Sequence, residues 1–123
     1  MQVGQVSRTL KLMSSEDDLN CSVLMVSQLS RNSEQRSNKR PVLSDLRDSG
    51  TIEQDSDIVI FAFPTLQYSS GTERTKVLKG FEDGFEPLDL IVGKNRDGET
   101  GVAKCAWRKD CGHVRSVKRD ESG

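Results

Sequence analysis

Apolar and polar residues alternate at a helical period near the start of the chain. Val6, Leu10 and Met13 stand three or four positions apart, and the pattern weakens at Ser14. This spacing places apolar side chains on one face of a helix. We therefore expect a frayed amphipathic helix over residues 5–19.

Three later segments are nearly continuous apolar runs, which is typical of strands covered on both faces. They span residues 22–29, 57–63 and 88–93. Strands of this kind are usually parallel neighbours in one sheet, with helices packed on its faces. We therefore expect an α/β fold with a mostly parallel sheet and with helices on the faces.

Two further segments alternate apolar with polar residues. They span residues 101–107 and, more weakly, residues 113–118, and a glycine-containing turn precedes each of them. Alternation and short turns of this kind are typical of β-hairpins. We expect them to form an antiparallel C-terminal hairpin edge of the sheet.

The segment between the second and third apolar runs has no clear period. Residues 64–87 begin and end with proline and contain several glycines. Long connections with such composition are typically loops. We expect a long and mobile loop here.

Composition limits the class of protein. The hydrophobic fraction is 33% and the charged fraction is 30% over 123 residues, so we expect one domain with a thin core. Lys+Arg total 18 against 19 for Asp+Glu, which excludes a polycation. A nucleic-acid surface would therefore have to be local. Residues 31–40 and 104–119 are locally basic, although either could be an ordinary solvated face.

The cysteine pattern favours a reducing compartment. Cys21, Cys105 and Cys111 are odd in number, and no secretory leader pattern is recognisable, so we expect a cytoplasmic protein. No apolar run approaches the roughly twenty residues that span a bilayer. Cys105, Cys111 and His113 lack a paired C-x-x-C motif, so we interpret them as free thiols and a surface histidine and expect no metal site.

Three segments, in their order and separation, resemble the DnaB family of replicative hexameric DNA helicases. They read VLMVSQLSR, KRPVLSDLRDSGTIEQDSDIVIF and LIVGKNRDGETG. The similarity covers residues 8–63 and 88–103, and it fades in the intervening loop and after Trp107. It implies a partial RecA-like fold, with residues 1–123 as the C-terminal half of a helicase motor domain.

The resemblance implies a DNA-binding loop. In the family, the corresponding loop lines the ring's channel and grips single-stranded DNA, which assigns DNA contacts to Arg47, Asp48 and Gly50. A glycine lets the backbone approach a phosphate, and an arginine fork matches its oxygens. Asp48 stands where the family usually has Glu, so its contact would use its backbone N–H. Arg31 would also face DNA, although it equally fits a solvated position.

The resemblance also implies two catalytic roles. Gln28 would sense the terminal phosphate of the nucleotide, whereas its position alone would suggest only a solvated strand end. Lys94 and Arg96 would reach into the neighbouring protomer's ATP site, with Arg96 as arginine finger and Lys94 as supporting cation. Such a finger is worth ~10³–10⁵ in rate. Without this context, the same residues would be only a charged turn.

The sequence contains no G-x-x-x-x-G-K-[ST] motif, so no phosphate-cradling loop is present. We therefore expect the C-terminal portion of an ATP-dependent DNA helicase that is catalytically incomplete alone. ATP and Mg²⁺ would act in the complete enzyme. Expected partners are single-stranded DNA, other subunits of a hexameric ring, and a primase or helicase loader of a primosome.

Other interpretations stay open at this point. The chain could be a stand-alone single-stranded-DNA-binding or helicase-modulating module, or a non-functional gene remnant. RecA-like recombinases lack the SDLRDSGTIEQDSD pattern. A non-enzymatic binding protein on a charged α/β scaffold fits the composition, and only the series of motifs argues against it.

Overall fold

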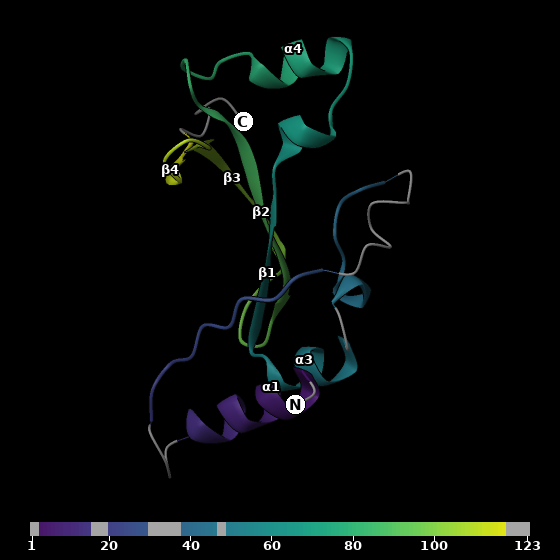
Figure 1. The fold of residues 1–123 in the computed structure, drawn as a ribbon, viewed down its shortest axis with the longest axis vertical. Coiled ribbons are helices and arrows are strands. Elements are labelled where there is room, and N and C mark those ends of the chain that lie inside the picture. The colour runs from purple at the N-terminus through teal and green to yellow at the C-terminus, as the bar shows by residue number, and fades with distance from the viewer. Residues whose placement is uncertain (1–2, 16–19, 30–37, 47–48, 118–123) are drawn as a thin grey trace. The chain divides into compact units, whose positions relative to one another are not determined.

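The computed structural model describes residues 3–15, 20–29, 38–46 and 49–117 (Figure 1). The chain divides into two compact units. Unit 1 comprises Met1–Val59 and Gly93–Glu99, and unit 2 comprises Ile60–Val92 and Thr100–Gly123.

In the described part of unit 1, two α-helices pack side by side, α1 (Val3–Met13) and α3 (Ser49–Asp55) (Figure 1). A short 3-10 helix, η1 (Leu43–Asp45), precedes α3. The expected N-terminal helix is thus confirmed, but it is shorter than predicted. The Ser14 hydroxyl donates to the Lys11 carbonyl at 2.8 Å, and such local bonding by serine competes with continuation of a helix.

The buried apolar residues of unit 1 are few in the segments that the structure describes. Leu46 precedes α3, Ile52 lies within it, and Val59 lies at the start of the following strand. A core this small agrees with the low hydrophobic fraction of the sequence.

The described residues form one four-stranded sheet with the order β1-β2-β3-β4. Its strands are β1 (Ile58–Phe63), β2 (Glu86–Asn95), β3 (Gly101–Arg108) and β4 (His113–Ser116). All four were expected, within a few residues at each end. The antiparallel hairpin is confirmed, because β2 pairs antiparallel with β3 and β3 pairs antiparallel with β4.

The prediction of a mostly parallel sheet is wrong for the described strands. The Arg96 amide, just after β2, donates to the Asp57 carbonyl, just before β1, at 2.9 Å. The end of one strand therefore meets the start of the other, and the two run antiparallel. Apolar runs show that a strand is buried, but they do not encode its direction.

The strand predicted at residues 22–29 does not form in this described segment. Residues 21–28 adopt no regular structure, and an isolated antiparallel bridge joins Leu29 to Leu46. A strand needs hydrogen-bonding partners for its backbone, and none of the described strands pairs with this segment. The apolar side chains are consequently exposed, with Leu24 at 92% and Val26 at 91%.

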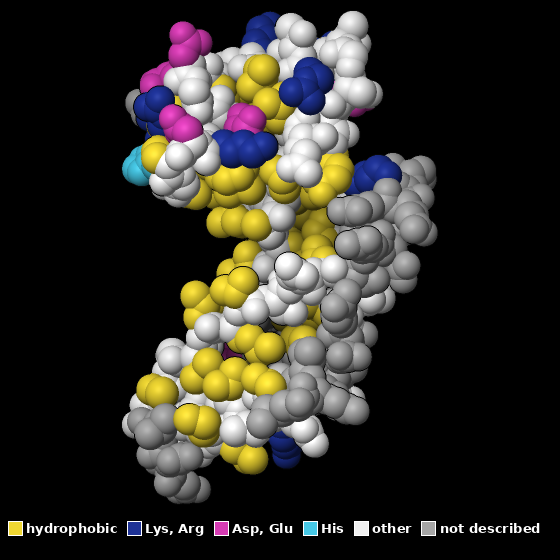
Figure 2. Space-filling view, in the orientation of Figure 1, with side chains coloured by type: hydrophobic (Ala, Val, Ile, Leu, Met, Phe, Trp, Pro, Cys, Tyr) yellow, Lys and Arg dark blue, Asp and Glu magenta, His cyan; other side chains and the backbone are white. Residues whose placement is uncertain are grey.

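The expectation that both faces of the apolar strands are covered also fails for β1. Its residues alternate between exposed and buried, with Val59, Phe61 and Phe63 buried and Ile58 and Ile60 exposed. Hydrophobic side chains accordingly reach the visible surface (Figure 2). A strand composed of apolar residues on both faces does not by itself supply the layers that would cover them.

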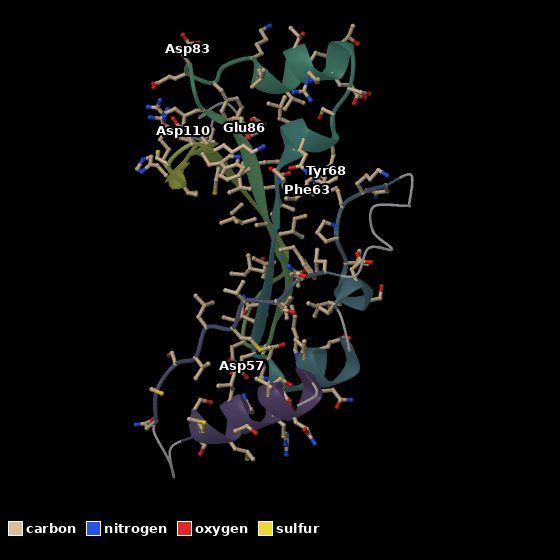
Figure 3. All side chains as sticks on the ribbon, in the orientation of Figure 1. Asp57, Phe63, Tyr68, Asp83, Glu86 and Asp110 are labelled. Atoms are coloured by element: carbon tan, nitrogen blue, oxygen red, sulfur yellow. The ribbon has the colours of Figure 1, made fainter. Side chains whose placement is uncertain are left out.

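Residues 64–87 are not one continuous loop. They include a 3-10 helix, η2 (Thr65–Tyr68), and an α-helix, α4 (Thr72–Leu78). The Phe63 and Tyr68 rings stack at 5.0 Å, which fixes η2 against the end of β1 (Figure 3). The glycines that suggested a loop mark the ends of α4, because Gly71 and Gly80 both have positive φ angles. The mobility of the segment stays a prediction.

Candidate functional site: a charged cluster at the end of strand β2

Lys94 and Arg96 project from the end of β2 and its following turn. Lys94 lies in the strand, whereas Arg96 lies in the turn that begins after Asn95. The Lys94 ammonium is half-buried and donates to the Glu53 carbonyl in α3. Arg96 is exposed. The two cations that the resemblance implied as a pair therefore both lie at the end of β2.

Asp57 binds Arg96 through both its backbone and its side chain. In addition to the backbone hydrogen bond, Arg96 Nη1 lies 2.6 Å from Asp57 Oδ1. Asp57 lies at the foot of β1, beside α1 (Figure 3). This carboxylate was not among the predicted site residues.

Lys11 of α1 adds a third cation. Its Nζ donates to Asp57 Oδ1 at 2.8 Å, so the same carboxylate oxygen contacts both Lys11 and Arg96. The pKa of Asp57 lies below its ordinary value because Lys11 donates this hydrogen bond. The charges of Lys11, Arg96 and Lys94 lower this pKa further, against an opposing contribution from burial. We call Lys11, Asp57, Lys94 and Arg96 the Asp57 cluster.

The turn that contains Arg96 is closed by its own contacts. The Asn95 side-chain amide donates to the Glu99 carbonyl at 3.2 Å, and the Gly98 amide donates to the Asn95 carbonyl at 3.3 Å. A Cβ at Gly98 would lie 2.6 Å from Asn95 Nδ2. Glycine at this position therefore allows the Asn95 side chain to brace the turn that carries Arg96.

A second carboxylate ties the same region to α1. Asp55, at the end of α3, is buried and accepts from the Ser7 hydroxyl at 2.9 Å and from Arg8 Nη1 at 3.3 Å. The pairing of these acids with α1 was not predicted from the sequence. The signal in the sequence was the alternation of acidic residues in EQDSD. These acids could pair with Ser7, Arg8 and Lys11 of the predicted N-terminal helix.

Two of the other predicted site residues are described by the structure, and neither belongs to the Asp57 cluster. Gln28 is exposed and lies outside any strand, and within the described residues no hydrogen bond or ion pair joins it to Lys94 or Arg96. Gly50 lies in the first turn of α3 rather than in a loop. Arg31, Arg47 and Asp48 lie outside the described residues, so their predicted DNA contacts stay predictions.

No group of three or more potential metal ligands occurs among the residues that the structure describes. Cys21 and Cys111 are exposed free thiols, and Cys105 is a partly buried one. His113 is exposed and meets the Phe85 ring edge-on at 6.1 Å. In the described part of the chain, no helix is both long and apolar enough to cross a membrane.

Comparison with known proteins identifies the family of this chain. Residues 1–116 match the family described as DnaB-like helicase C terminal domain. The replicative DNA helicase DnaB of Geobacillus stearothermophilus is 36% identical over 118 residues, which cover 96% of this chain and 23% of the relative. The replicative DNA helicase DnaC of Bacillus subtilis is 36% identical over 124 residues, covering 99% of this chain and 25% of the relative.

Solved structures agree with these matches. One solved ATPase domain has a TM-score of 0.74 at 37% identity, covering 94% of this chain and 36% of that one. A DnaB-like replicative helicase, studied with its primase interactions, has a TM-score of 0.76 at 38% identity, covering 95% of this chain and 25% of that one. The chain thus spans about a quarter of the length of the curated relatives named above. It belongs to the family of DnaB-like helicase C-terminal domains.

Proposed function

We propose that this chain is the C-terminal portion of a replicative ATP-dependent DNA helicase, which unwinds duplex DNA by translocating on single-stranded DNA as a ring. In this proposal, Arg96 is the arginine finger and Lys94 the supporting cation, and both act on ATP bound by the adjacent subunit. The family match supports the helicase class. The relatives named above are replicative DNA helicases.

The arrangement of Lys94 and Arg96 carries the proposal. Phosphoryl transfer spreads negative charge over the transferred group, and a cation supplied from outside the nucleotide site stabilises that charge. Arg96 is 47% exposed at the side chain and stands on a braced turn at a strand end. In the proposal, this exposed guanidinium enters the neighbouring subunit's nucleotide site.

Complementation between mutant subunits tests a finger that acts in trans. The test protein is a complete replicative helicase of this family in which residues 1–116 of this chain replace the matching segment, which we call the grafted helicase. Rings of Arg96→Ala subunits and rings of subunits with a disabled P-loop should both be inactive. Mixed rings should recover part of the DNA-stimulated ATP turnover, because an intact finger then meets an intact cradle at some interfaces.

Two outcomes would contradict the proposal. If Arg96→Ala rings retained full turnover, the residue would be an ordinary charged turn residue. If mixed rings recovered nothing although both subunits assembled, Arg96 would not act across the interface. Arg115→Ala, which removes an arginine outside the Asp57 cluster, is the matched control and should leave turnover unchanged.

We propose that ATP binding and hydrolysis depend on a phosphate-binding loop whose motif is not in this sequence. The sequence has no phosphate-cradling motif, so the purified chain should bind nucleotide weakly and show no turnover. ATP and Mg²⁺ would act only in the complete ring. Robust hydrolysis by the pure chain would contradict this part of the proposal.

Single-stranded DNA is the proposed nucleic-acid partner. Arg31, Arg47, Asp48 and Gly50 would contact its backbone, and Gln28 would relay the state of the terminal phosphate. Phosphate contacts make binding insensitive to sequence and weaker at high salt. Arg47→Ala should therefore weaken binding more than Arg108→Ala, and equal losses would indicate a nonspecific basic surface. A primase or a helicase loader is a further proposed partner.

A further inference from the structure

We propose that Asp57 is a positioning residue that orients the Arg96 guanidinium for its action on the neighbouring subunit's nucleotide. This inference rests on the proposed role of Arg96 as a finger. It concerns a carboxylate that the resemblance did not assign and that contacts neither nucleotide nor DNA in the proposal.

The contact between the two residues restrains one end of the guanidinium and leaves the other available. Arg96 Nη1 lies 2.6 Å from Asp57 Oδ1, and the Arg96 amide is bound to the Asp57 carbonyl at 2.9 Å. Within the described residues, no other ion pair or hydrogen bond engages the Arg96 side chain. Its remaining N–H groups can therefore donate to phosphate oxygens while Asp57 holds Nη1.

Exposure of the pair argues for orientation rather than stabilisation of the fold. The Asp57 and Arg96 side chains are 56% and 47% exposed, and ion pairs this exposed contribute little to stability. A free arginine side chain samples many rotamers, and it must be confined to one of them when the transition state forms. A carboxylate that restricts them beforehand lowers the entropic cost of the reaction step.

Lys11 compensates for the negative charge that Asp57 places beside the Arg96 guanidinium. Asp57 alone would offset the positive charge that Arg96 must deliver. Lys11 contacts the same Oδ1 at 2.8 Å, and Lys94 stands nearby on β2. With three cations around one carboxylate, the Asp57 cluster keeps a net positive charge while it retains the orienting contact.

The position of Asp57 is itself fixed by the preceding residues. The Ser56 amide donates to the Ile52 carbonyl at 3.0 Å, and Asp55 is bound by Ser7 and Arg8 of α1. The backbone of Asp57 therefore lies at a constrained junction between α3 and β1. A flexible surface acid could not orient Arg96 in this way.

The test compares Asp57→Asn with Asp110→Asn in the grafted helicase. Asp110 is the matched control, because it is an exposed acid that lies 3.7 Å from Arg108 outside the cluster. Asp57→Asn should lower kcat for DNA-stimulated ATP hydrolysis about tenfold with little change in KM, since misplacement of a catalytic group acts on the reaction step. Asp57→Glu should restore most of the loss, and Asp110→Asn should change nothing.

A double variant separates this inference from the proposed function. In an Arg96→Ala background, Asp57→Asn should have no further effect, because there is no guanidinium left to orient. If Arg96→Ala itself left turnover intact, the finger proposal would fail. If Arg96→Ala abolished turnover while Asp57→Asn matched the wild type, only the positioning role would be refuted. A rise in turnover with Asp57→Asn would also refute it, because Asp57 would then compete with phosphate for Arg96.

A measurement on the chain itself does not depend on ring assembly. The nuclear magnetic resonance order parameter of the Arg96 Nε–H group reports how restricted the side chain is. It should fall in Asp57→Asn and stay unchanged in Asp110→Asn. An Arg96 order parameter that is equal in wild type and Asp57→Asn would overturn the inference.

Discussion

Two arginine-containing clusters of the molecule use the same residue types in opposite ways. In unit 1, Arg96 contacts one carboxylate at one end of its guanidinium and is otherwise exposed. In unit 2, Arg115 lies over the Phe85 ring at 3.9 Å and also pairs with Glu82 at 3.3 Å. Arg108 approaches the same ring at 5.5 Å. We call this second group the Phe85 cluster.

The two clusters differ in whether the arginine guanidinium is engaged within the chain or remains able to bind a further group. The face of the Arg115 guanidinium is engaged by an aromatic ring and its edge by a carboxylate, so it serves to hold β4 against Phe85. Arg96 has no aromatic contact among the described residues and stands on a braced turn. The comparison therefore predicts a catalytic effect for one arginine and a structural effect for the other.

The largest expected effect is on turnover. Arg96→Ala in the grafted helicase should lower DNA-stimulated ATP turnover by ~10³-fold or more with nucleotide affinity nearly intact, because a finger acts on transition-state charge. Lys94→Ala should act in the same direction but more mildly. Steady-state kinetics and nucleotide-binding titrations measure both quantities. Arg115→Ala is the control, and a comparable loss there would erase the distinction between the clusters.

The next effect is on the free energy of unfolding. Here the larger loss should come from the Phe85 cluster and the smaller one from the Asp57 cluster. Phe85→Ala should lower the free energy of unfolding of the chain by about 2 kcal/mol, because it removes a half-buried ring and its two guanidinium contacts. Asp57→Asn should cost about 0.5 kcal/mol or less, as expected for an exposed ion pair. Urea unfolding followed by circular dichroism compares them. Equal losses would mean that the Asp57 cluster is structural as well.

A smaller effect concerns the turn that carries Arg96. Gly98→Ala should destabilise the chain by about 1 kcal/mol, because the new Cβ would collide with the Asn95 amide and displace its bond to Glu99. Gly101→Ala is the matched control, because nothing lies within 4 Å of a Cβ there. Thermal unfolding should give a lower Tm for Gly98→Ala than for Gly101→Ala. A Gly98→Ala variant as stable as Gly101→Ala would show that the turn yields easily.

The smallest effect is a dependence of stability on pH. Lys11 lowers the pKa of Asp57 in the folded chain through its hydrogen bond, and the charges of Arg96 and Lys94 act in the same direction. A depressed carboxyl pKa stabilises the folded state above the ordinary value of 3.8, and this contribution is lost as the pH falls through the folded pKa.

The stability difference between wild type and Asp57→Asn should therefore be constant near neutral pH and disappear in acid. Unfolding measured across this range tests the prediction, and high salt should shrink the difference because the pair is exposed. A difference that grew in acid would have the wrong sign for this cluster.

Local sequence patterns predicted the helix and strand positions that depend on neighbouring residues. The alternation in residues 101–107 and the glycine-containing turn before it are sufficient to indicate a hairpin, and the hairpin is present. The segment LIVGKNRDGETG likewise placed Lys94 and Arg96 at the end of a predicted strand, and both lie there in the structure. Their pairing came from the resemblance of this segment to the family. Family membership followed from the same motifs.

Tertiary structure alone decided which distant segments meet. The run at 22–29 has strand-like residues, but it found no hydrogen-bonding partner among the described strands, and β1 took β2 as an antiparallel neighbour. The contact of Asp57 with Lys11 and Arg96 likewise joins three separate elements. Periodicity records which face of an element is apolar, whereas strand direction and ion-pair partners depend on non-local packing that no local pattern encodes.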